Sequence, residues 1–150
     1  MKKEVKQIKG KNYYLLGINK EGQKVWLEQS SFDCGWYWGI GYVEVFNRSY
    51  SDIQEHTHFD SLFLKNNIYD SFKGYFNDIT LEDKEIWQLL ELMKTLYTYR
   101  NFSDMIHTKG SHITTNNCKD IISNDELYKD INERIIPTLL EEVYNLLGGC

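Results

Sequence analysis

The sequence predicts an α+β fold, in which a small antiparallel β-sheet from the N-terminal half packs on helices from the C-terminal half. The chain has 150 residues, the usual size of one domain, so we expect a single domain over residues 1–150. Its hydrophobic content of 41% and charged content of 26% are ordinary for globular proteins and exclude disorder as the main state. The pattern is β-rich to about residue 65 and takes helical spacing from about residue 66.

The N-terminal half is predicted to begin with a β-hairpin. Residues 13–18 and 24–28 are short aromatic strand candidates, and residues 19–22 between them form a suitable turn whose glycine can adopt a positive φ. A longer strand is expected over residues 36–46. Glycines in and beside it would weaken a plain strand and indicate a bulge or a group packed closely on the backbone; they are Gly35, Gly39 and Gly41. Residues 55–64 form either a fourth strand or a structured loop.

The C-terminal half is predicted to be helical. Residues 80–83 combine an N-cap threonine with first-turn acids, which suit the positive end of a helix dipole. An apolar stripe then predicts a helix to about residue 100 or beyond; its members are Ile86, Leu89, Leu90, Met93, Leu96 and Tyr97. A second long helix is expected over residues 125–147, kinked or divided by Pro137. Its inward residues are expected to be Leu127, Ile131, Ile135, Leu139, Val143 and Leu147. A short helix is expected over residues 67–76.

The charge and cysteine content bear on partners and location. Seventeen basic and 22 acidic residues give a net charge of −5, which disfavours direct nucleic-acid binding and favours a basic protein partner. No apolar run approaches the ~20 residues that span a bilayer, and the N-terminus lacks the apolar stretch of a secretory signal. Three cysteines are an odd and sparse set, so we expect reduced thiols in a cytosolic protein rather than a disulfide framework.

The histidines predict a metal site. His56 and His58 form an H-x-H pair, and in an extended segment both imidazoles would project to one face and could approach one ion. Cys34, at the start of the glycine-rich strand, could supply a thiolate, and His112, in a loop after the main helix, a third imidazole. Three nitrogens and one sulfur suit a structural zinc ion that ties the strands to a helical loop.

Other residues are alternatives to these ligands. Asp60, which follows the pair by two residues in the same extended segment, is either a ligand or an acceptor that fixes an imidazole tautomer. Cys118 is an alternative to Cys34. His107 flanks the same loop as His112 and is an alternative to it. Cys150, at the end of the chain, is expected to be a bystander. An H-x-H pair that is merely polar surface is the competing interpretation, because no C-x-x-C or H-E-x-x-H pattern occurs.

An enzyme is the alternative function. His112-Ile113-Thr114 matches half of the H-x-T pair of the two-histidine phosphoesterases, in which one histidine acts as base and the other as acid. The second histidine would be His56 or His58, although neither has a hydroxyl residue at the third position. Two nucleotide hypotheses follow: a phosphodiesterase that cleaves a nucleotide signal, and a sponge that sequesters one.

Three segments carry a resemblance to a known class of protein: Phe32–Gly39 (FDCGWYWG), His56–Phe63 (HTHFDSLF) and Gly110–Asn116 (GSHITTN). Together they resemble small phage and prophage proteins of low-GC Gram-positive bacteria. Within these, the chain is similar to type II anti-CRISPR proteins, which inhibit Cas9 and include a zinc-containing kind. The resemblance implies a non-enzymatic counter-defence protein that binds Cas9, or another basic host defence protein, in the host bacterial cytoplasm. Its implied zinc ligands are Cys34, His56, His58 and His112.

Overall fold

The computed structural model describes residues 1–29, 41–46, 52–110 and 126–148, and the side chains of residues 107–110 lie outside this description. The elements are β1 (Val5–Ile8), β2 (Lys11–Asn19), β3 (Lys24–Glu28), β4 (Tyr42–Phe46), β5 (Ile53–His58), α1 (Phe59–Phe63), α2 (Ile68–Tyr75), β6 (Phe76–Ile79), α3 (Asp83–Gly110), a π-helical turn η1 (Ile131–Ile135) and α5 (Ile136–Gly148). Residues 126–130 are helical and lead into η1.

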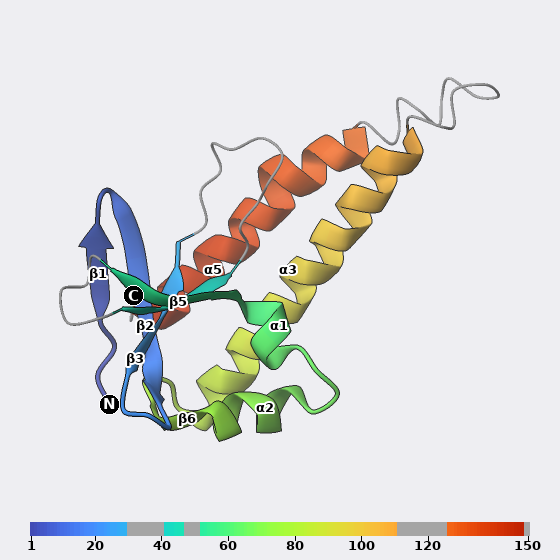
Figure 1. Cartoon of the computed structure of the whole chain (residues 1–150). Helices are drawn as coiled ribbons and strands as arrows, with labels where there is room; N and C mark the ends of the chain where they lie inside the picture. Colours follow the sequence, from blue (N-terminus) through green and yellow to red (C-terminus); the bar gives the residue numbers. More distant parts are fainter. Residues whose placement is uncertain (30–40, 47–51, 111–125, 149–150) are drawn as a thin grey trace.

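The sheet confirms the predicted α+β fold. Its strands run in the order β1-β2-β3-β4-β5, every pair is antiparallel, and β6 pairs with β2. β1 pairs with the first part of β2, and β6 pairs with its last part. Both therefore lie on the edge of β2 that faces away from β3. Figure 1 shows the sheet at one end of two long antiparallel helices, α3 and α5, which extend beyond it.

The predicted N-terminal hairpin is confirmed, and its turn is built by one side chain. Asn19 Oδ1 accepts hydrogen bonds from the backbone N–H groups of Glu21 (3.0 Å) and Gln23 (2.9 Å). Gly22 has a φ of 81°, which is the left-handed conformation that glycine adopts without steric cost. The turn therefore fixes the register between β2 and β3.

The two long helices cover one face of the sheet. Valine and leucine side chains of β3 and β4 point to this face and form the main core together with the apolar stripe of α3. All six residues of that stripe are buried, as the sequence predicts. At the other helix, Tyr14 of β2 stacks on Tyr144 of α5 with ring centroids 4.9 Å apart and an interplanar angle of 8°. This contact joins the sheet to α5.

The start of α3 differs from the prediction. Glu82, rather than Thr80, occupies the N-cap position, and its N–H donates to the Glu85 side chain (3.1 Å), as in half of a capping box. Thr80 is buried and hydrogen-bonds to the sheet instead. Its hydroxyl donates to the carbonyl oxygens of Leu15 (2.9 Å) and Leu16 (3.1 Å). These carbonyls lie where the β2–β3 register shifts, and the Leu16 oxygen also accepts the Thr80 N–H at 3.0 Å, so Thr80 ties the end of β6 to this bulge.

Pro137 neither ends nor divides the last helix; the turn before it is π-helical. The Ile136 N–H donates to the carbonyl oxygen of Ile131, five residues back, where proline would disturb regular α-helical pairing. The extra residue in this turn changes which side chains face inward. The buried residues are Ile131, Ile136, Leu140, Val143 and Leu147. The predicted inward positions 135 and 139 are only partly buried, and Leu127 is 38% exposed.

Several elements correct the sequence analysis. Residues 55–64 are neither one strand nor a loop, because β5 gives way to α1 at Phe59. The short strands β1 and β6 were not expected, and β6 places a strand in the predicted helical half. The expected strand over 36–46 is a strand from Tyr42, and residues 36–40, Gly35 and Gly39 lie outside the described residues. The expected short helix over 67–76 is confirmed as α2.

Gly41 is the one glycine of that strand region that the structure describes, and a neighbouring element packs closely on it, as predicted. Gly41 has a φ of 70°, and a Cβ built there would lie 2.6 Å from Met93 Cε and 3.1 Å from Phe59 Cβ. Its carbonyl oxygen accepts the N–H of Phe59 at 2.7 Å. Another element is thus packed closely on this glycine, as predicted.

Gly17 is a point of close approach between β6 and β2. A Cβ at Gly17 would lie 2.2 Å from the backbone oxygen of Asp78, so any larger residue must push the two strands apart. We predict that Gly17→Ala lowers the free energy of unfolding by roughly 1–3 kcal/mol, as overpacking does in other cores. Urea denaturation measures this change.

Gly74→Ala is the matched control, because an added Cβ at this exposed position of α2 meets nothing within 4 Å. It should leave the free energy of unfolding unchanged or raise it by up to about 1 kcal/mol, since alanine is the better helix former. Equal losses in the two variants would contradict the steric explanation for Gly17.

Candidate functional site

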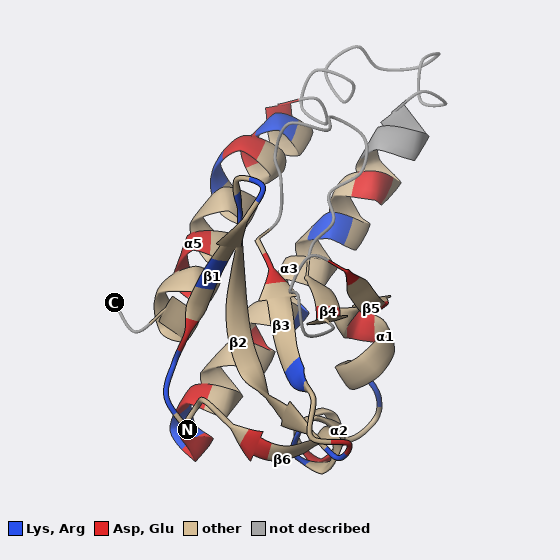
Figure 2. Cartoon of the chain, turned by 60° about the vertical axis from the view of Figure 1, so that its left-hand side comes forward, with Lys and Arg blue, Asp and Glu red and all other residues tan. Residues whose placement is uncertain are grey.

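Polar side chains gather on the face of the sheet opposite the long helices. Strand alternation directs Glu28 of β3, Glu44 of β4 and His56 of β5 to this face, together with the fully buried Trp26. In Figure 2 the sheet lies in front of α3 and α5, so this face is turned toward the viewer. Glu44 lies directly opposite both Trp26 and His56 in the ladder. The sheet itself therefore brings these groups together.

The three side chains form one cluster, whose centre is Glu44. His56 Nδ1 lies 2.6 Å from Glu44 Oε1, and Lys11 Nζ lies 2.7 Å from Glu28 Oε1. One ligand atom each from Glu28, Glu44 and His56 lies within 4.8 Å of the other two. The Glu44 side chain is 1% exposed, whereas that of His56 is 46% exposed. The cluster thus has a buried carboxyl end and a solvent-facing imidazole end.

Burial and proximity give the carboxyl groups of Glu28 and Glu44 different pKa values. Burial, followed by the hydrogen bond and negative charge of Glu28, raises the pKa of Glu44 to about 8. Burial also works to raise the pKa of Glu28, but hydrogen bonds with Glu44 and Lys11 and the charge of Lys11 lower it below its usual value. Burial and the two glutamates together raise the pKa of Tyr13 to about 12. At neutral pH the pair of carboxyl groups therefore holds one shared proton.

The structure brings together only part of the predicted zinc site. His56 and His58 share a face, as predicted, and both rings contact Tyr42, with centroid distances of 4.4 Å and 4.6 Å. Among the residues that the structure describes, His56 groups with the two glutamates, and His58 joins no group of three metal-ligating side chains. The remaining predicted ligands Cys34 and His112, and the alternative Cys118, lie outside the described residues, as does Cys150.

Two of the alternative ligands are placed differently from the prediction. Asp60 does not continue the strand face of His58, because α1 begins at Phe59; its side chain accepts the N–H of Ser61 at 2.9 Å. His107 does not lie in a loop, because α3 extends to Gly110.

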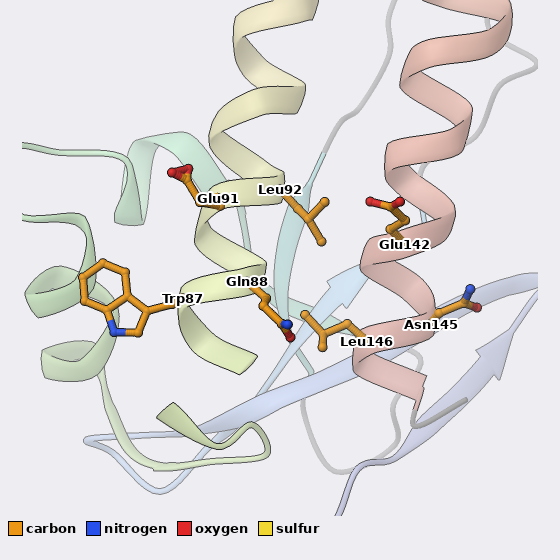
Figure 3. A pocket seen from close by; sticks show the side chains of 7 residues that line it. All are labelled: Trp87, Gln88, Glu91, Leu92, Glu142, Asn145 and Leu146. Carbon is orange, nitrogen blue, oxygen red and sulfur yellow. The ribbon is translucent and has the colours of Figure 1, made fainter. Parts of the chain in front are cut away.

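A groove between α3 and α5 is the second candidate site. It has a volume of about 640 Å³ and is lined by Trp87, Gln88, Glu91, Leu92, Glu142, Asn145 and Leu146. Figure 3 shows Leu92 on α3 and Leu146 on α5 pointing into the space between the helices, with Glu142 above Leu146. Both leucines are partly buried against the main core, so the floor of the groove is apolar and held in place.

Trp87 lies at the edge of this groove, on the side of α3 that faces away from α5 (Figure 3), and is the most exposed large apolar side chain described, at 56%. Its ring stacks on Tyr69 of α2 with centroids 4.4 Å apart and an interplanar angle of 7°. The stacking fixes the orientation of an exposed indole. The described lining residues include two carboxylates and no basic side chain, so the groove combines apolar surface with negative charge.

Glu28 and Glu44 of the cluster, and the groove between α3 and α5, were not predicted from the sequence. Glu44 stands between Val43 and Val45, a pattern that suggests a solvent-facing strand position, yet this carboxyl group is buried. Trp87 stands one residue after the stripe residue Ile86, on the face of α3 that the stripe leaves exposed, and this spacing is the signal that could have indicated it.

The raised pKa of Glu44 predicts how stability varies with pH. The unfolded state releases the Glu44 proton near pH 4.5, whereas the folded state keeps it up to about pH 8. The contribution of Glu44 to the free energy of unfolding is therefore full below about pH 4.5 and is lost as the pH rises to about 8. Between these pH values the Glu44 contribution to the free energy of unfolding falls by on the order of 1 kcal/mol per pH unit. The groups that face Glu44 are Glu28 of β3, His56 of β5, and Lys11 and Tyr13 of β2. The lowered pKa of Glu28 changes the free energy of unfolding only below about pH 4.5.

Glu44→Gln removes the titrating group and keeps its shape. Urea denaturation of both proteins from pH 5 to 8, in buffer with a metal chelator, should show a shallower loss of stability in the variant. The variant should also equal or exceed the wild type in stability at pH 8. Parallel pH profiles for the two proteins would contradict the raised pKa of Glu44.

Comparison with family models, curated proteins and solved structures finds no match to this chain. The resemblance to type II anti-CRISPR proteins therefore stays a prediction, and its segments Phe32–Gly39 and Ser111–Asn116 lie outside the described residues. Of the helices that the structure describes, none is long and apolar enough to cross a membrane.

Proposed function

We propose that this chain is a non-enzymatic inhibitor that binds a basic protein through the groove between α3 and α5. The groove supports the proposal because it offers the features of a protein-binding surface: an apolar floor, a fixed and exposed tryptophan, and charged side chains at the sides. Glu91 and Glu142 are both exposed, so their charges are available to a partner. The net charge of −5 acts in the same direction.

The occupant that fits this groove is a basic segment with an apolar side chain. The apolar side chain would lie between Leu92 and Leu146, and Lys or Arg residues beside it would pair with the two glutamates. Cas9 is the partner that the sequence resemblance suggests, and another basic host defence protein is the alternative. Binding at such a surface would inhibit the partner by occupying part of its surface, with no chemical step. It would take place in the host bacterial cytoplasm.

Charge reversal in the groove tests the proposal. The double variant Glu91→Lys, Glu142→Lys should weaken binding to purified Cas9 by more than about tenfold, because like charges would then face each other. Wild-type binding should also weaken between low and high salt, since salt screens charge-led contacts. Pull-down and titration by biolayer interferometry measure both effects, and circular dichroism checks that the variant folds.

Glu55→Lys is the matched control, since Glu55 is an exposed glutamate on β5 that does not line the groove. It should bind as the wild type does. No binding of the wild-type chain to Cas9 would overturn Cas9 as the partner. Equal binding by the control and the double variant would overturn the groove as the site.

The non-enzymatic part of the proposal has a separate test. Cyclic and linear nucleotides incubated with the protein should be recovered unchanged and unbound by chromatography. Cleavage that is lost in His112→Ala would instead support the phosphodiesterase, and retention without cleavage would support the nucleotide sponge.

A further inference from the structure

In the part of the chain that the structure describes, the carboxyl group of Glu44 meets that of Glu28 only through a shared proton, and one of its oxygens accepts no hydrogen bond. Among the described residues, no hydrogen-bond donor reaches its Oε2 atom, although this atom is buried. Buried polar atoms are rarely left in this state, because each one loses its contacts with water without replacement. Glu44 Oε1 already faces His56, and the neighbouring carboxyl group of Glu28 offers acceptors. A cation at this point would satisfy the buried oxygen.

We propose that Glu28, Glu44 and His56 together bind one divalent transition-metal ion, such as Zn²⁺. This site goes beyond the proposed function, since it lies on the sheet face opposite the two helices that form the groove. It also differs from the ligand set expected from the sequence, because it needs neither Cys34 nor His112.

The geometry suits such an ion. In a tetrahedral zinc site with nitrogen and oxygen ligands, bonds of about 2.0–2.2 Å place the ligand atoms roughly 3.3–3.6 Å apart. The three ligand atoms here lie within 4.8 Å of one another, so shifts of about an ångström complete the site. The ligands come from the adjacent strands β3, β4 and β5, whose pairing holds their backbone positions. His56 is the ligand nearest solvent, which leaves a fourth position for water.

The chemistry of the ligands selects the class of ion. One imidazole and two carboxylates are a mixed nitrogen–oxygen set, which zinc accepts and which Mg²⁺, a cation that prefers oxygen and water, does not favour. Lys11 contacts one oxygen of Glu28, and its side chain is 51% exposed, so it can withdraw toward solvent when a cation enters. Bound metal would then link three neighbouring strands.

Calorimetric titration of the chelator-stripped full chain tests the site. Zn²⁺ should bind with a stoichiometry of one and raise the melting temperature, whereas Mg²⁺ at the same concentration should do neither. Glu44→Gln and His56→Gln should each weaken zinc binding by more than about tenfold. Glutamine keeps the approximate shape of both side chains, and circular dichroism verifies that the variants fold.

His58→Gln is the matched control, because His58 also contacts Tyr42 but lies outside the cluster. It should bind zinc as the wild type does. Absence of zinc binding would overturn the proposal. So would zinc binding that survives Glu44→Gln but is lost in Cys34→Ser or His112→Ala, which would support the ligand set expected from the sequence. Neither result would alter binding at the groove, so the two proposals fail separately.

Discussion

The pairing of β6 with β2 is the constraint on which the rest of the structure depends. β2 contacts three strands, and its last residues accept β6 only because Gly17 has no side chain to meet the backbone of Asp78. Thr80 follows immediately and fastens the same junction through its backbone N–H and its hydroxyl group. Since α3 begins three residues later, this junction sets where the long helix starts and which residues it directs at the sheet.

Both candidate sites depend on β2, in different ways. Trp87 lies in the second turn of α3, so its position beside α2 and its stacking on Tyr69 follow from where the helix begins. The polar cluster depends on the sheet, because β2 supplies Lys11 and pairs with β3, which supplies Glu28. One face of the sheet thus supports the helices and their outer groove, while the other holds a buried acid next to an imidazole.

Local patterns were sufficient to predict the hairpin, the apolar stripe of α3 and the short helix α2. Each of these follows from neighbouring residues: a turn with Asn19 and Gly22, or apolar side chains three and four positions apart. β1 and β6 could not be predicted in this way, since four-residue strands become stable only through a partner that is distant in sequence. In the stripe of the last helix, Ile131, Val143 and Leu147 are buried as predicted. Positions 135 and 139 are only partly buried, because a regular helical period cannot anticipate a π-helical turn.

The candidate site was predicted only through His56. Strand alternation correctly predicts that this histidine and His58 share one face of a strand, but the partners expected from the sequence are cysteines and a histidine. The partners that the structure supplies are glutamates on two adjacent strands, selected by register. A glutamate between two valines is typical of a solvated strand position. Its burial is a property of the assembled sheet, which a single strand does not reveal.

The π-helical turn before Pro137 has a consequence for the outer surface of the molecule. Each residue of an α-helix advances the chain by about 100°, so one additional residue in η1 rotates all of α5 by about that angle relative to Ile131. In an uninterrupted α-helix the positions aligned with Ile131 would include 138 and 142, which would turn the carboxylate of Glu142 toward the core. The single extra residue therefore determines that α5 presents acid to the solvent and aliphatic side chains to the sheet. A natural variant with one residue fewer in this turn would have to change its surface and its interior together.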